Sequence, residues 1–127
     1  MITAPSKTKI LIVDDDAVEA LGMCEMLSLV GLEVVGVATR VKDALCLAED
    51  TRPDVAILDI RLAGQRDGIE GALILRRTVG LPVIIVTGQS DAATMARAAE
   101  AQPVALLAKP VRAGQLVAAV ETAISAQ

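Results

Sequence analysis

The sequence predicts an α/β fold, a doubly wound parallel sheet of five strands with helices on both faces. Five short apolar runs rich in Val, Ile and Leu alternate with five longer segments of helical character. The runs are continuously apolar, which is typical of strands covered on both faces. A chain of 127 residues has the size of one such domain. We therefore expect a single domain over residues 1–127, with 1–8 as a flexible tail.

Each predicted strand is a run of five mainly apolar residues, many of them β-branched. In chain order these strands are "KILIV" (9–13), "EVVGV" (33–37), "DVAIL" (54–58), "PVIIV" (82–86) and "VALLA" (104–108). Because they alternate with helices, right-handed crossovers place the carboxyl ends of all five strands at one edge of the sheet.

The five predicted helices fill the segments between and after these strands. They cover about 16–30, 41–50, 67–79, 91–102 and 113–126. Gly31 and Gly80 mark helix ends, since glycine is favoured just after the last helical turn. Pro53 and Pro103 end the second and fourth helices. By spacing, the core candidates on these helices are Leu21, Cys24, Leu27, Leu45, Leu73 and Leu116.

The composition excludes several classes of function. The chain has no His, and therefore no Ser-His-Asp triad, no His-metal site and no phosphohistidine of its own. It has no aromatic residue for stacking nucleic-acid bases, and its net charge is -4, so we expect no direct nucleic-acid partner. No stretch is long enough to span a membrane, and the "MITAPSKTK" start has no apolar signal region. We expect a cytoplasmic protein in which Cys24 and Cys46 are reduced core residues.

Polar side chains follow four of the five predicted strands. Asp14, Asp15 and Asp16 follow the first strand, Asp59 the third, Thr87 the fourth, and Lys109-Pro110 the fifth. This edge is where open α/β sheets keep their sites. One lysine cannot neutralise all the acids, whereas a hard divalent cation with oxygen ligands can. The sequence therefore predicts a Mg²⁺ site here.

This pattern resembles the receiver domains of bacterial two-component response regulators. The family carries an acid pair after strand one, a phosphoacceptor Asp after strand three, Ser or Thr after strand four and Lys-Pro after strand five. Here these positions are Asp14-Asp15, Asp59, Thr87 and Lys109-Pro110. The resemblance covers residues 9 to about 125 and implies a flavodoxin-like strand order 2-1-3-4-5.

The resemblance also implies roles for these residues. Asp59 would accept a phosphoryl group from the phosphohistidine of a histidine kinase or a histidine phosphotransfer protein. Carboxylates of Asp15 and Asp59 and the backbone carbonyl of Arg61 would bind Mg²⁺, and Asp14 would hold a metal-bound water. Lys109 would pair first with the resting carboxylate and then with the phosphoryl group, to which Thr87 would donate its hydroxyl. The only reactions of the protein would be self-catalysed transfer of the phosphoryl group to Asp59 and autodephosphorylation. We expect the protein to be a monomer or a weak homodimer.

Two positions depart from the family pattern. Leu106 stands where most receivers carry an aromatic residue that moves with the Thr, and Val111 stands where Phe is common. The usual aromatic switch cannot operate. We expect the response to be carried instead by the loop from Thr87 to Asp91 and by the helix at 91–102. The loop "IRLAGQRDG" also looks longer than usual and lacks the common Met-Pro.

Other interpretations of the same residues compete with this one. Asp16 is better explained as a helix N-cap than as a ligand. The stretch "ILIVDDDAV" also fits the first motif of haloacid-dehalogenase-like phosphatases, with Asp14 as nucleophile and Asp16 as general acid. That alternative leaves Asp59 without a role and lacks a later acidic motif. A binding module that has lost phosphorylation is a third possibility. No output domain is visible after the last helix, so we expect a stand-alone receiver.

Overall fold

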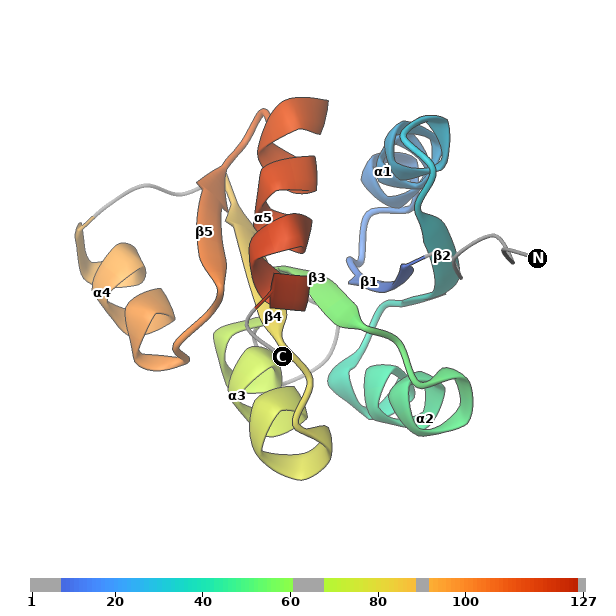
Figure 1. Cartoon of the computed structure of the whole chain (residues 1–127). Coiled ribbons are helices and arrows are strands. Elements are labelled where there is room, and N and C mark those ends of the chain that lie inside the picture. Colours follow the sequence, from blue (N-terminus) through green and yellow to red (C-terminus); the bar gives the residue numbers. More distant parts are fainter. Residues whose placement is uncertain (1–7, 61–67, 89–91, 126–127) are drawn as a thin grey trace.

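The computed structural model describes residues 8–60, 68–88 and 92–125. Its five strands form one parallel sheet in the order β2-β1-β3-β4-β5 (Figure 1), which confirms the predicted fold and strand order. The strands are β1 Lys9–Val13, β2 Glu33–Ala38, β3 Val55–Asp59, β4 Val83–Thr87 and β5 Ala105–Ala108. Strand β3 lies in the middle of the sheet, and β2 and β5 form its edges.

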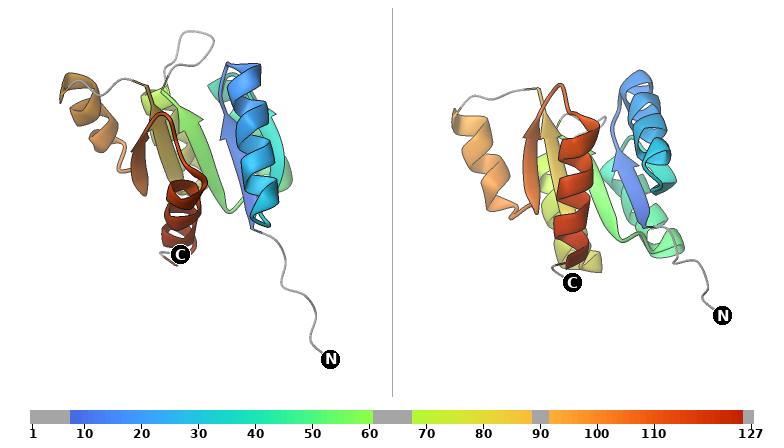
Figure 2. Two further views of the ribbon diagram at one scale, coloured as in Figure 1. Left: turned by 90° about the horizontal axis from the view of Figure 1, so that it is seen from above. Right: turned by 45° about the horizontal axis from the view of Figure 1, so that its top comes forward.

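The helices alternate with the strands as predicted. They are α1 Ala17–Leu29, α2 Val41–Thr51, α3 Gly68–Val79, α4 Ala92–Glu100 and α5 Ala113–Ser125. Helices α1 and α5 cover one face of the sheet, α2 and α3 cover the other, and α4 lies beside β5 at the edge (Figures 1 and 2). No helix in the described ranges is long and apolar enough to cross a membrane.

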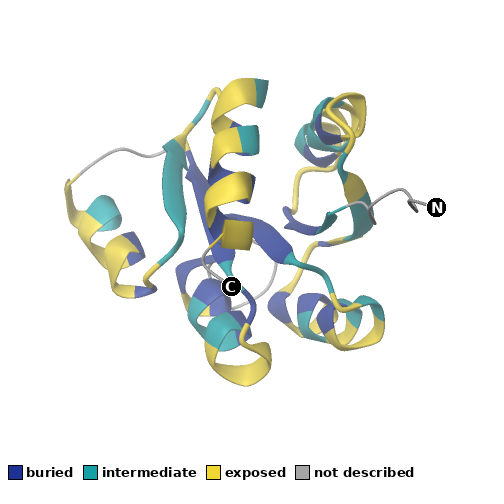
Figure 3. Cartoon of the chain, viewed as in Figure 1, coloured by how far each residue is buried: buried dark blue, intermediate teal, exposed yellow. Residues whose placement is uncertain are grey.

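The sheet separates two apolar cores, because successive strand side chains point to opposite faces. On the α1–α5 side, strand residues such as Ile10, Ile12, Ile57 and Ile84 pack with Leu27 and Leu116. On the α2–α3 side, strand residues such as Leu11, Leu58 and Ile85 pack with Leu75. Both faces of β3 and β4 are buried, whereas β5 is only half-buried (Figure 3). The continuous apolar runs thus reflect strands that are covered on both sides.

Helix α1 shows where sequence patterns locate an element well and where they fail. Asp16 caps this helix, since its Oδ1 accepts hydrogen bonds from the backbone N–H of Val18 (2.9 Å) and Glu19 (3.1 Å), as predicted. Gly31 follows the helix with a φ of +87°, which glycine adopts without a steric penalty. Leu21, however, is 61% exposed rather than in the core, because α1 is apolar around much of its circumference and spacing cannot select the buried face.

The two cysteines differ from the sequence prediction as well. Cys24 is half-buried and packs against the core on the α1–α5 side, whereas Cys46 on α2 is exposed. Both are free thiols. Cys46 lies on the outer side of a helix whose buried residues are Val41, Ala44 and Ala48, so it does not belong to the core.

Candidate functional site

Four strands deliver polar side chains to the same edge of the sheet. Asp59 and Thr87 are the last residues of β3 and β4, while Asp14 and Lys109 directly follow β1 and β5. Among the described residues, the buried polar or charged side chains are Asp14, Asp59 and Thr87. All three therefore lie at the carboxyl edge, where the sequence placed them.

Lys109 connects two carboxylates across this edge. Its Nζ lies 2.5 Å from Asp59 Oδ2, and 2.8 and 3.0 Å from Glu19 Oε1 and Oε2. Burial by itself would lower the pKa of Lys109, but its hydrogen bonds to Asp59 and Glu19 outweigh burial and raise the pKa above the usual value. The ammonium is therefore charged and serves as the counter-ion of both acids.

Asp14 is the least satisfied acid of the site. It is 1% exposed, and its Oδ1 accepts a hydrogen bond of 2.9 Å from the Asp16 backbone N–H. Its Oδ2 is buried without a hydrogen-bond partner among the described residues. Burial raises the pKa of Asp14 to about 6, and the nearby charges of Asp59 and Glu19 act in the same direction. A buried carboxylate oxygen without a partner is costly unless another group neutralises it.

A cation fits this arrangement. Carboxylate oxygens of Asp14, Glu19 and Asp59 lie within 4.8 Å of one another, and hard divalent cations prefer such oxygen ligands. Asp15, predicted as a ligand, is exposed and is not part of this three-acid group. Arg61, whose backbone carbonyl was also predicted to bind the metal, lies outside the described residues. Asp14 and Asp59 are thus brought together, and Glu19 joins them.

Sequence reasoning missed Glu19. It stands three residues after the N-cap Asp16, a position where glutamate usually completes a capping box with the start of its own helix. That local explanation conceals its contact with Lys109, which lies 90 residues further along the chain. Only the fold, which brings Glu19 within hydrogen-bond distance of the Lys109 side chain, reveals the pair.

Backbone groups at the start of α3 and two apolar side chains lie close to the ends of the strands that form the site. The Gly68 backbone N–H donates to the Ile60 carbonyl oxygen at 2.6 Å, and a Cβ built on Gly68 would lie 2.0 Å from the carbonyl oxygen of Asp59. The start of α3 is therefore pressed against the backbone that carries Asp59. Leu106 is half-buried against the α2–α3 core, and Val111 packs against the α1–α5 core.

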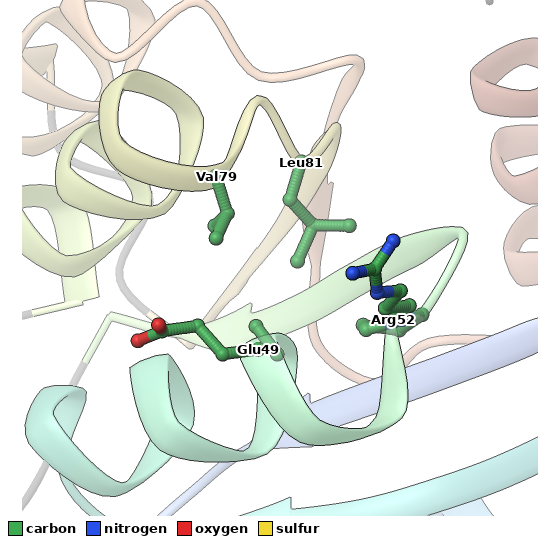
Figure 4. Close-up of a pocket in the computed structure, with 6 residues that line it drawn as sticks. Glu49, Arg52, Val79 and Leu81 are labelled. Atoms are coloured by element: carbon green, nitrogen blue, oxygen red, sulfur yellow. The ribbon is translucent and has the colours of Figure 1, made fainter.

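One surface hollow reaches the site, and another lies away from it. A groove of about 580 Å³ extends from Glu19 and Lys109 between α1 and α5, over apolar residues that include Met23, Met26 and Leu116. A hollow of about 430 Å³ lies between the carboxyl ends of α2 and α3. Glu49, Arg52, Val79 and Leu81 face one another there (Figure 4). Among the described residues, no predicted site residue lines this second hollow.

Comparison with known proteins gives the family. The model of the response regulator receiver domain matches residues 10–121. The transcriptional regulatory protein PdtaR of Mycobacterium tuberculosis is 34% identical over 117 residues, which cover 92% of this chain and 57% of PdtaR. The DNA-binding response regulator MtrA of Mycobacterium leprae is 32% identical, over 90% of this chain and 50% of MtrA. The chain thus spans about half the length of these relatives.

Solved structures agree with the sequence relatives. The signal receiver domain of a modulated diguanylate cyclase from Desulfovibrio desulfuricans G20 is 37% identical, with a TM-score of 0.89 over 95% of this chain and 96% of that one. A CheY-like response regulator receiver domain protein from Methanospirillum hungatei JF-1 is 27% identical, with a TM-score of 0.83 over 95% and 96%.

Proposed function

Since the chain belongs to the family of response regulator receiver domains, we propose that Asp59 accepts a phosphoryl group from a phosphohistidine on a partner protein. The observation that carries this proposal is the pairing of the buried Asp59 with Lys109 beside the buried Asp14. The 127 residues contain no His, so the donor histidine lies outside them, and we propose that it belongs to a histidine kinase or a histidine phosphotransfer protein. Receiver domains act in signalling, and turnover here would be limited to self-catalysed transfer and autodephosphorylation.

In the proposed step, a carboxylate oxygen of Asp59 attacks the phosphorus of the phosphohistidine. The new O–P bond forms as the P–N bond breaks, and the imidazole nitrogen leaves with the electron pair and is protonated by solvent. Lys109 donates hydrogen bonds to the phosphoryl oxygens, and the Thr87 hydroxyl donates to another of them. The buried position of Asp59 keeps the acceptor fixed against the incoming group.

The acids around Asp59 would hold Mg²⁺. The proposed ligands are the Asp15 and Asp59 carboxylates and the Arg61 backbone carbonyl, with Asp14 holding a metal-bound water. The unpartnered Oδ2 of Asp14 supports a cation at this position. Mg²⁺, when bound, supplies positive charge that offsets the negative charge of the phosphoryl oxygens. Lys109 alone cannot supply this charge, because its ammonium already serves both Glu19 and Asp59.

The groove between α1 and α5 starts beside Lys109, the hydrogen-bond partner of Asp59. It begins at Lys109 and Glu19 and continues over apolar side chains, so a protein surface bearing the phosphohistidine would contact both the site and this groove. The phosphorylated chain would then act through protein contact or by onward phosphotransfer to another histidine.

The test is chemical labelling. Acetyl phosphate with Mg²⁺ should produce an acid-labile aspartyl phosphate on the wild type and none on Asp59→Asn. Asp50→Asn removes an exposed carboxylate on α2 and should label as the wild type does. Full labelling of Asp59→Asn would refute the proposal. Loss of labelling on Asp14→Asn with Asp59 dispensable would instead support the phosphatase alternative.

A further inference from the structure

The contact between Glu19 and Lys109 has no place in the roles proposed above. The Lys109 ammonium offers three hydrogen-bond donors. Two nitrogen–oxygen distances, 2.8 and 3.0 Å, join it to the Glu19 carboxylate, and one of 2.5 Å joins it to Asp59. Of these three short contacts, two therefore go to Glu19 and one goes to the resting phosphoacceptor.

Phosphorylation changes what surrounds this ammonium. A phosphoryl group brings about 1.5 to 2 negative charges and three acceptor oxygens. These acceptors need the same Lys109 donors that Glu19 holds in the structure. The Glu19 side chain is 39% exposed, whereas that of Asp59 is 7% exposed, so water can solvate Glu19 when it loses the ammonium.

We propose that Glu19 is a positioning residue, which holds the Lys109 ammonium in the resting site and competes with the phosphoryl group for it. This inference rests on the proposed function of Asp59. It makes Glu19 an opponent of the phosphorylated state: the carboxylate stabilises the resting ion pair and repels the phosphoryl charge. It also connects the first turn of α1 to the chemistry at the end of β3, because release of Lys109 frees Glu19.

The experiment compares binding of beryllofluoride, a phosphoryl mimic, at saturating Mg²⁺. The chain has no Tyr or Trp, so calorimetry or backbone amide shifts replace intrinsic fluorescence. We expect Glu19→Gln to bind the mimic about three- to tenfold more tightly than the wild type, in the range of a partly exposed charged hydrogen bond. A defect in folding would weaken binding, so a gain is a result that mere structural damage does not produce. Glu25→Gln removes the same charge from an exposed position on the same helix and should bind as the wild type does.

The salt dependence of binding distinguishes direct competition for Lys109 from long-range repulsion between the Glu19 charge and the phosphoryl mimic. At about 1 M salt the Debye length is about 3 Å, which screens separated charges far more than a hydrogen-bonded pair. A gain for Glu19→Gln that persists there supports competition for Lys109. A gain that disappears, or an affinity equal to or below the wild type at low salt, overturns the inference. Failure of the wild type itself to bind the mimic would instead overturn the function proposed for Asp59.

Discussion

The Asp16 backbone N–H donates a 2.9 Å hydrogen bond to Asp14 Oδ1 and leaves Oδ2 of the same buried carboxylate without a partner among the described residues. One backbone donor does not offset the burial of this group, and its pKa is raised to about 6. In the metal-free site, the ionised form of Asp14 is therefore destabilised near neutral pH. The next two predictions concern protonation and Mg²⁺ binding, which relieve this destabilisation.

Asp14 should make the stability of the metal-free protein depend on pH. Its folded pKa of about 6 exceeds the ordinary 3.8, so between these values the folded state binds more protons than the unfolded state. The free energy of unfolding therefore falls as pH rises through this window. Above it, Asp14→Asn should be more stable than the wild type by up to about 3 kcal/mol. Below it, the two should differ little.

Denaturant unfolding in the presence of a chelator, on both sides of the window, measures this difference. Asp50→Asn on α2 controls for the loss of one exposed charge and should follow the wild-type profile. Parallel pH profiles for the wild type and Asp14→Asn would contradict the raised pKa.

Mg²⁺ should stabilise the fold. Binding to the folded state alone raises the melting temperature by mass action, so millimolar Mg²⁺ should shift the wild type upward at low salt. Asp15→Asn should raise metal-free stability by removing repulsion and should reduce the Mg²⁺ shift. If the Mg²⁺-induced rise in melting temperature is unchanged in Asp15→Asn and smaller in Glu19→Gln, the metal ligands are Asp14, Glu19 and Asp59 instead. A wild-type melting temperature that does not change with Mg²⁺ would contradict the proposed metal site.

Gly68→Ala should disrupt the site from behind. The added Cβ would lie 2.0 Å from the Asp59 carbonyl oxygen, so the backbone of α3 or of β3 must move. We expect a loss of about 1 to 3 kcal/mol, the usual cost of overpacking, and slower labelling of Asp59 by acetyl phosphate. Gly22→Ala, within α1 and with open space around the new Cβ, should instead stabilise by about 0.5 to 1 kcal/mol. Equal stability of the two variants would contradict the close approach.

Helix α4 should respond to phosphorylation. Its one buried residue is Ala98, and elements with few apolar contacts have low local stability. Without an aromatic residue at position 106, we expect the backbone at 92–100 to be mobile in the resting state and to become ordered with the phosphoryl mimic and Mg²⁺. Backbone ¹⁵N relaxation tests this, with α2 as the reference helix. Equal relaxation in both states would show that the response follows another route.

Much of this architecture could be predicted because local signals agreed with the fold. The run "KILIV" is β1 with its predicted bounds, and Asp16 caps α1 as its residue type suggested. Asp59 and Lys109 could be paired in advance, because parallel strands with right-handed crossovers bring their carboxyl ends together. Each of these inferences needs only period, cap chemistry or topology.

Other features depend on how the helices rotate and settle, which one sequence does not specify. Leu21 and Leu27 both lie on an apolar helix, yet one is exposed and the other buried. Glu19 reaches Lys109 only because the fold brings the first turn of α1 within reach of the Lys109 side chain. The sequence offered a sufficient local explanation for Glu19 in the capping-box position, and it therefore gave no reason to look for a distant partner.

The central place of β3 has a practical consequence for measurement. All five of its residues are buried, and β1 and β4 pair with it on either side. Its amide protons should therefore exchange with deuterium mainly when the whole domain unfolds. The exchange rate of the strand that carries Asp59 therefore measures global unfolding of the domain. Amides elsewhere in the chain that exchange faster than those of β3 report local opening. Comparing their rates with those of β3 in the same sample separates local opening from a change in overall stability.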